Sequence, residues 1–407
     1  MSLKKLNRLL NNHLETLARE HRLKGPEIII SEVILSENMK GTRYRIVGEG
    51  ERKYLRMNSN SYLGLSRNRE VIQASEENAH RYGCGPGAVR FISGTCEVHH
   101  RLEKALAKFH GREDCILFNS AYSAVMGSLP FLVQGKTVII TDELNHNSII
   151  NAARLAAPAG KEIYSHSDMG ELEEILLKSA DIYERAIIVT DGIFSMRGDH
   201  APLTAIRKLA DTFEEMFPGG IIIVMDDSHG IGAFGTTGRG TEEYTGTRSD
   251  LLIGTMGKAL GVNGGYLVSD SPVISYLRET SPFYIYTNPI TPPEAGAALK
   301  ALEILDSSEG HLLLGHIRNL VHILQEGLKG LELEILESEH PIVPVILRDT
   351  MRVDRIIKKL FKKGILATGI TYPVVPRGEE EIRLQVTADM GEEDVALFLK
   401  SLAAALN

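Results

Sequence analysis

The chain has 407 residues, of which 43% are hydrophobic and 24% charged, a balance typical of a soluble globular enzyme with room for two domains. Its formal net charge of −8 argues against nucleic acid or an anionic membrane as a partner. Cys84, Cys96 and Cys115 are unevenly spaced, which predicts neither a disulfide framework nor a zinc site and favours a reducing cytoplasm. The apolar stretches are strand-sized and no signal peptide is recognisable, so nothing directs the chain to a membrane.

The first 56 residues differ in pattern from the following 250. A polar helix is predicted over residues 3–22, followed by short strand-like pieces. Beyond residue 57, short β-branched runs alternate with longer helical stretches, as in βα units. Because these runs are continuously apolar, we expect strands buried on both faces of a mostly parallel sheet, at residues 115–118, 137–140, 186–189, 221–224, 251–253 and 266–268. Ligands of such sheets bind beyond the carboxyl ends of the strands.

The C-terminal part has the pattern of a second, smaller α/β unit. A helix over residues 292–306 is followed by expected strands at 342–347 and 382–386 and expected helices at 353–363 and 393–405. The chain is therefore predicted to divide into an N-terminal segment (1–56), a large domain (57–300) and a small C-terminal domain (301–407).

Two segments of the large domain together predict a pyridoxal phosphate site. Lys258 lies in a glycine-rich turn, and a lysine with a lowered pKa can form a Schiff base with an aldehyde. Asp226 directly follows an apolar strand, where its carboxylate could keep a pyridine nitrogen protonated as an electron sink. The Thr255 hydroxyl could reach the phosphate. Taken singly, Lys258 could be a solvated loop residue and Asp226 a turn residue.

Other candidate residues are ambiguous from spacing alone. Ser120 opens a helix after a strand, a position that suits a phosphate but also suits an ordinary N-cap. His146 follows another strand, where a lone histidine is more often a capping or packing residue. Asn60 stands in a turn and Arg383 in a strand, although a planar guanidinium is a natural clamp for a carboxylate.

The segments 224–230 (VMDDSHG) and 235–240 (GTTGRG) resemble the α-oxoamine synthase family, pyridoxal phosphate enzymes that condense a small amino acid with an acyl-CoA. The resemblance extends from about residue 10 to about residue 400. It implies an α/β enzyme of fold-type I, whose large domain holds a mostly parallel seven-stranded sheet and whose smaller C-terminal α/β domain closes over it. It also implies a homodimer whose subunits share the active site.

The same resemblance implies a role for each candidate residue. The catalytic residues would be Lys258, Asp226, His229 and His146, with His229 on the phenolic oxygen and His146 against the ring. Further cofactor contacts would come from Ser120, Ala121, Tyr122, Ser195 and Thr255, and from Thr287 and Asn288 of the neighbouring subunit. The amino-acid carboxylate would be bound by Asn60 and Arg383.

The sequence segments that indicate the identity of the two substrates are less specific than those that indicate the cofactor. Residues 88–95 are most similar to the glycine C-acetyltransferase branch of the family, and Val89 and Phe91 lack the polar contacts that a succinyl group would need. Glycine and acetyl-CoA are therefore the expected pair, and an 8-amino-7-oxononanoate synthase-type reaction of alanine with a longer acyl-CoA is the alternative. Arg197, where the family usually has an aspartate, and residues 387–390 depart from the family on the acyl-CoA side.

Two alternatives come from other classes of protein. An aminotransferase would share the fold and the lysine–aspartate pair, but it needs no thioester pocket. A non-catalytic, cofactor-binding partner subunit would be expected to lack the lysine, whereas Lys258 is present.

Overall fold

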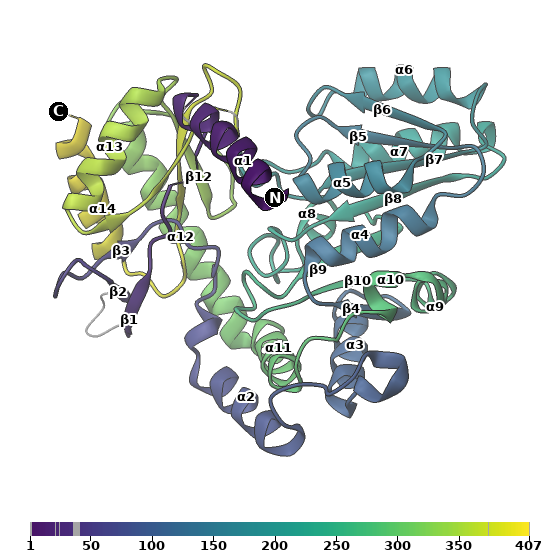
Figure 1. The fold of residues 1–407 in the computed structure, drawn as a ribbon, viewed down its shortest axis with the longest axis horizontal. Helices are drawn as coiled ribbons and strands as arrows, with labels where there is room; N and C mark the ends of the chain where they lie inside the picture. Colours follow the sequence, from purple (N-terminus) through teal and green to yellow (C-terminus); the bar gives the residue numbers. More distant parts are fainter. Residues whose placement is uncertain (1, 21, 24, 36–40, 373, 407) are drawn as a thin grey trace.

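The computed structural model describes residues 2–20, 22–23, 25–35, 41–372 and 374–406. A seven-stranded sheet forms the centre of the larger unit, with strand order β4-β10-β9-β8-β7-β5-β6 (Figure 1). Its strands are β4 (Asp114–Phe118), β5 (Thr137–Asp142), β6 (Gly160–Tyr164), β7 (Arg185–Asp191), β8 (Ile221–Asp226), β9 (Leu251–Thr255) and β10 (Gly265–Ser269). All neighbouring pairs are parallel except those of β10, which runs antiparallel to β4 and β9. The mostly parallel seven-stranded sheet is thus confirmed.

Alternate residues of the central strands belong to different hydrophobic clusters, which explains their continuous apolar sequence. In β5, Val138 and Ile140 belong to one cluster, while Ile139 between them belongs to another. Both faces are therefore buried under helices. The helices of this unit are α2 (Arg69–Tyr82), α3 (Glu97–Phe109), α4 (Ala121–Leu132), α5 (Asn147–Ala156), α6 (Met169–Ala180), α7 (Leu203–Phe213), α8 (Thr241–Thr245), α9 (Ser271–Thr280), α10 (Pro282–Ile285) and α11 (Pro292–Leu305).

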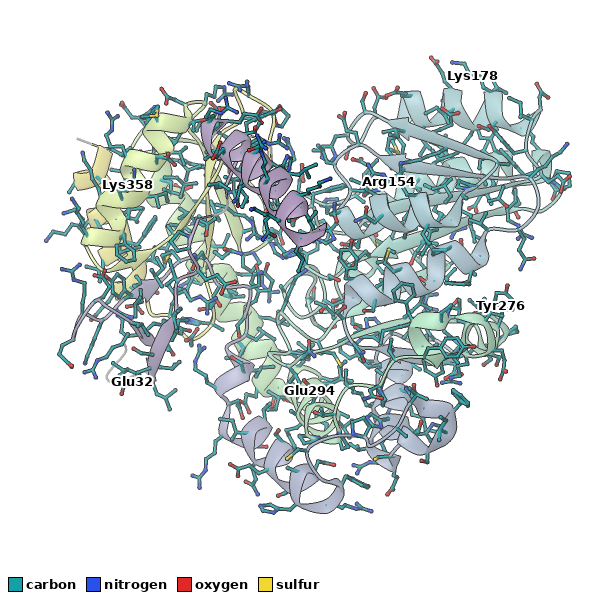
Figure 2. The ribbon with its side chains drawn as sticks, in the orientation of Figure 1. Glu32, Arg154, Lys178, Tyr276, Glu294 and Lys358 are labelled. Carbon is teal, nitrogen blue, oxygen red and sulfur yellow. The ribbon has the colours of Figure 1, made fainter. Side chains whose placement is uncertain are left out.

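The smaller C-terminal unit is a four-stranded antiparallel sheet covered by helices. Its strands are β11 (Glu334–Ile335), β12 (Ile342–Ile346), β15 (Glu381–Gln385) and β14 (Thr368–Ile370), in that spatial order. The helices are α12 (Ser308–Gly330), α13 (Thr350–Lys362) and α14 (Glu392–Leu406). Figure 2 shows Lys358 on α13 and Lys178 on α6 at the outer surfaces of the two units.

The N-terminal residues join the C-terminal unit. After α1 (Ser2–Arg19), β1 (Ile30–Ile34) and β2 (Arg43–Ile46) pair with each other, and β3 (Leu55–Arg56) pairs in parallel with β13 (Ile365–Leu366). Helix α1 ends before the predicted limit at residue 22, and residue 21 lies outside the described part of the chain. The division into domains 1–56, 57–300 and 301–407 stays a prediction. No helix of the described residues is long and apolar enough to span a bilayer.

Candidate active site

A cavity of about 230 Å³ lies beyond the carboxyl ends of the central strands. Loops that follow β4, β5, β7, β8 and β9 contribute its walls, as expected for an open α/β sheet. The predicted site residues that line it are Ser120, Ala121, Tyr122, His146, Ser195, Asp226, His229, Thr255 and Lys258. Thus most of the candidates, although scattered over 139 positions from residue 120 to residue 258, face one cavity.

The amine of Lys258 has the properties of a nucleophile. Burial lowers its pKa from 10.5 to about 8, although the carboxylates of Asp226 and Asp191 act in the opposite direction. About a tenth of the amine is therefore uncharged at pH 7, far more than in an exposed lysine.

Asp226 and Asp191 are adjacent carboxylates at the ends of β8 and β7, paired in register. Asp226 accepts hydrogen bonds from the backbone N–H and the hydroxyl of Ser228, at 3.1 and 2.5 Å. Asp191 accepts one from the backbone N–H of His146 at 2.8 Å. Burial and the neighbouring charge of Asp226 raise the pKa of Asp191 well above its usual value. Asp191 is therefore expected to keep its proton to a higher pH than an exposed aspartate does.

His146 is the N-cap of α5, and its ring faces the cavity. Its Nδ1 accepts a hydrogen bond from the backbone N–H of Ser148 at 3.2 Å, and the ring of Tyr122 stands edge-on to it. Burial lowers the pKa of His146, against the opposing charge of Asp226. The imidazole is therefore neutral at pH 7.

His229 is held by two groups from distant parts of the chain. Its Nδ1 lies 2.7 Å from the hydroxyl of Tyr62, and its backbone carbonyl accepts a hydrogen bond from Nε2 of His340 at 2.9 Å. Burial raises the pKa of Tyr62 to about 12, so this hydroxyl keeps its proton and donates it to Nδ1. The His229 ring, whose pKa burial lowers well below the usual value, therefore carries its proton on Nε2.

The N-terminus of α4 also lines the cavity. Ser120 is its N-cap and accepts a hydrogen bond from Ser123 at 3.0 Å, while the backbone N–H groups of Ala121 and Tyr122 lie in the first turn and have no acceptor within the helix. Thr255 donates to the carbonyl of Gly264 at 3.1 Å. A Cβ at Gly265 would lie 2.2 Å from the Ala121 nitrogen, so only glycine permits this close approach of β10.

Arg383 and Asn60 are not among the residues that line this cavity. Arg383 is 8% exposed, lies on β15 and donates a hydrogen bond to the carbonyl of Ser195. Two residues along the strand, Gln385 donates to Asn60 at 2.5 Å. The C-terminal sheet thus places a buried guanidinium beside the site, with an amide held nearby.

Thr287 and Asn288 do not line the cavity of their own chain. They follow α10, where the Thr287 hydroxyl donates to the carbonyl of Phe283 at 2.5 Å. Their contribution to a neighbouring subunit's site remains a prediction.

Several residues at the site were not predicted from the sequence. Asp191 stands at a strand end and follows the same logic as Asp226, so a comparison of strand ends could have found it. Tyr62 and His340 could not be found in this way, because they act through contacts between segments more than 100 residues apart. Among the described residues no group of three or more His, Cys, Asp or Glu side chains is arranged for a metal ion.

The chemistry of this cavity fits pyridoxal phosphate, since an amine of lowered pKa, a buried carboxylate pair and an open helix N-terminus meet in it. Together with the mostly parallel sheet and the smaller C-terminal unit, these groups define a pyridoxal phosphate-dependent transferase of fold-type I.

Comparisons with known proteins narrow this class. Residues 52–402 match the family model described as aminotransferase class I and II. The chain is 37% identical to an 8-amino-7-oxononanoate synthase of Thermosipho melanesiensis, over 86% of this chain and 87% of that protein. It is 36% identical to the human mitochondrial 2-amino-3-ketobutyrate coenzyme A ligase, over 97% of this chain and 90% of that protein. A serine palmitoyltransferase structure from Sphingomonas wittichii superposes with a TM-score of 0.86 at 26% identity, covering 99% of this chain and 97% of that one.

The chain belongs to the aminotransferase class I and II family and, within it, to the α-oxoamine synthases. The fold-type, the cofactor and the class of enzyme, a pyridoxal phosphate-dependent acyltransferase, are therefore confirmed.

Proposed function

We propose that this enzyme condenses glycine with acetyl-CoA and releases CoA. The observation that carries the proposal is the convergence of the Lys258 amine, the Asp226 carboxylate and the Arg383 guanidinium, because the charges of Asp226 and Arg383 both act on the pKa of Lys258. The choice of glycine and acetyl-CoA is supported by the human relative, whose match extends over 97% of the chain. The reaction needs an amine, a partner for the ring nitrogen and a group that binds the amino-acid carboxylate, and the proposal assigns these roles to Lys258, Asp226 and Arg383.

In this proposal, Lys258 would hold the cofactor through its amine, Asp226 would contact the pyridine nitrogen, and His229 would contact the phenolic oxygen. The N-terminus of α4, from Ser120 to Tyr122, would bind the phosphate of the cofactor together with Thr255. Ser195 and His146 complete the walls. Pyridoxal phosphate, when bound, withdraws electrons from the Cα atom of an amino acid and so makes its C–H bond acidic.

The protein's own groups then direct the reaction. Arg383, assisted by Asn60, binds the amino-acid carboxylate and turns the Cα–H bond towards Lys258. Once the amino group of the substrate has replaced Lys258 on the cofactor, the released amine of Lys258 would take the Cα proton as general base, which its pKa of about 8 permits near neutral pH. The nucleophilic Cα attacks the thioester carbonyl; a C–C bond forms, the C–S bond breaks, and CoA departs.

A longer acyl donor with alanine is the second candidate. It is favoured by the 37% identity to the Thermosipho melanesiensis 8-amino-7-oxononanoate synthase. A second cavity of about 410 Å³, which shares Ser195 with the first, also offers room for a larger acyl-CoA.

The proposal includes a cytoplasmic homodimer in which Thr287 and Asn288 reach the partner's phosphate site. Helix α1 supports self-association, since its leucines are exposed in the single chain, with Leu3 at 70% and Leu9 at 64%. Exposed leucines repeated along one helix usually meet a partner.

The test is release of free CoA from the cofactor-loaded enzyme, with glycine, alanine and serine each crossed with acetyl-, succinyl-, pimeloyl- and palmitoyl-CoA. Release with glycine and acetyl-CoA alone is expected, with the β-keto amino acid identified by mass. Release with alanine and pimeloyl-CoA would select the second candidate. Amino-group transfer to a keto acid without CoA release would identify an aminotransferase and contradict the proposal.

A further inference from the structure

Strand β15 presents a row of three polar side chains towards the site. Because side chains alternate along a strand, Glu381, Arg383 and Gln385 share one face, while Ile382 and Leu384 join the core on the other. Gln385 contacts Asn60, and Arg383 contacts the carbonyl of Ser195. Glu381 is the first residue of the row along the chain, and its carboxyl group takes part in neither of these contacts.

Glu381 lines the second cavity and lacks a partner there. It is 3% exposed, and its Oε1 has no hydrogen-bond partner within the described part of the chain. Burial raises the pKa of this carboxyl to about 8, although the charges of Arg383 and Arg197 act against the shift. An unsatisfied buried carboxyl destabilises a fold, so a ligand atom that satisfies it would bind favourably.

The rest of the wall limits what that ligand can be. Leu144, Phe194 and Met196 give the cavity an apolar side. Arg197, which also lines it, is held through Nε by Asp199 at 3.0 Å, which leaves the remaining N–H groups of the guanidinium as donors. The other charged groups of the wall have both signs, since Arg197 and Arg348 line it together with Glu143, Glu334 and Glu379, so that neither a cation nor an anion is favoured along the whole cavity.

A neutral amide on an apolar chain matches both polar groups. The amide N–H can donate a hydrogen bond to Glu381, and the amide carbonyl can accept one from Arg197. The methylene groups of the chain can contact the apolar wall. We propose that Glu381 and Arg197 form a subsite for the secondary amides of the pantetheine arm of the acyl donor. This inference rests on the proposed function, which supplies a thioester whose thiol arm carries such amides.

The experiment compares two acetyl thioesters in the holoenzyme, S-acetylpantetheine, which carries the amides, and S-propyl thioacetate, which lacks them. With wild type, kcat/KM for glycine-dependent thiol release is expected to favour S-acetylpantetheine by about 10-fold to 100-fold, the range for hydrogen bonds to charged groups. Glu381→Leu should reduce this preference at least about 10-fold and leave the KM of glycine unchanged. Glu381→Gln, which keeps an acceptor, should retain most of the preference.

Glu380→Gln is the matched control, because Glu380 is a neighbouring buried glutamate that accepts a hydrogen bond from Gly378 at 2.9 Å and lines no part of the cavity. Its preference should equal that of wild type. An unchanged preference in Glu381→Leu, or an equal loss with both thioesters, would overturn the subsite. Calorimetric binding of free pantetheine, expected to weaken about 10-fold in Glu381→Leu, decides the question without turnover. If wild type turns over neither thioester, the proposed function is contradicted, and the calorimetric binding of pantetheine still tests the subsite separately.

Discussion

At the scale of single residues, the charge state of Lys258 decides whether the site has a nucleophile. Burial removes the solvent that would stabilise an ammonium ion, and Asp226 and Asp191 restore only part of that stabilisation. The site therefore combines two opposing influences on one amine, and each can be altered separately by mutation.

The first prediction concerns the pH at which the apoprotein binds pyridoxal phosphate through Lys258. The rate of attachment, followed by absorbance, should rise with pH around a midpoint near 8, because the free amine reacts and the ammonium does not. Asp226→Asn should move the midpoint to lower pH, since it removes a negative charge that favours the ammonium. Asp270→Asn, at the surface before α9, serves as the control. An upward shift in Asp226→Asn would contradict the assignment.

The second prediction concerns Arg383. Arg383→Ala should raise the KM of the amino acid by about 10-fold to 100-fold, because a charge-assisted bidentate contact is lost, while the KM of the acyl donor changes little. Arg383→Lys should recover only part of the loss, as an ammonium lacks the planar fork. Arg207→Ala, in a half-buried ion pair with Asp250, is the matched control. An unchanged amino-acid KM would remove Arg383 from this role.

Sequence reasoning could identify residues whose neighbours in the chain reveal them, such as Lys258 in its glycine-rich turn. It could assign His146, His229 and Arg383 only through resemblance to a family, because a single histidine or arginine has no local signature. Tyr62, which meets His229 across 167 positions, depends on tertiary packing that no local pattern encodes.

At the scale of elements, the buried strands of the large sheet followed from hydrophobic pattern, whereas β6, α12 and the short strands β11, β13 and β14 were not predicted. Strand β6 is an edge strand whose Lys161, Glu162 and Ile163 are exposed, so it lacks the apolar run that marks the buried strands. Helix α12 was not predicted, although Leu314, Ile317, Leu324 and Leu328 recur at helical spacing and are buried. The sequence of β6 therefore has only a weak strand pattern, whereas the sequence of α12 has a clear helical pattern.

The third prediction tests the contact between β10 and α4. Gly265→Ala should destabilise the fold by about 1–3 kcal/mol and weaken cofactor binding, since the new methyl group would collide with the backbone at Ala121. Thermal unfolding and titration with pyridoxal phosphate measure the two effects. Gly315→Ala in α12 is the control; its Cβ meets nothing within 4 Å, and it should stabilise the helix by about 0.5–1 kcal/mol.

The fourth prediction concerns the loop between β6 and α6. Burial disfavours a charged His166, but hydrogen bonds with Asp142 and Asp199 outweigh this and raise its pKa to about 9 from 6.5. Because the folded pKa is raised, the stabilisation is fully present below pH 6.5 and is lost as pH rises through about 9.

Accordingly, His166→Asn should lower the free energy of unfolding by on the order of 1–3 kcal/mol at pH 6, and by much less at pH 10. Denaturant titrations at both pH values measure the difference. His311→Asn on α12 should show no such trend, and a difference that grows with pH would refute the ion-pair account.

At the scale of the whole molecule, the proposed sharing of sites between subunits has a direct test. Lys258→Ala and Thr287→Asp variants should each be nearly inactive, the second because its carboxylate would repel the partner's phosphate. Mixed and re-associated, they should recover about a quarter of wild-type activity, since half of the dimers pair the variants and each such dimer has one intact site. No recovery in verified mixed dimers would mean that Thr287 serves its own chain.

The pairing of β3 with β13 has a consequence for biosynthesis. Residues 55–56 and 365–366 are about 310 positions apart, so the early strand leaves the ribosome long before its partner exists. At roughly 5–20 residues per second, translation separates them by roughly 15–60 s. During that interval the seven-stranded sheet can assemble while β3 has no partner strand, although β1 and β2 can already pair with each other. A nascent chain arrested before residue 365 should therefore contain a folded cofactor-binding core, while the segment around β3 stays sensitive to proteases. Chaperones that act during translation are expected to bind this N-terminal segment.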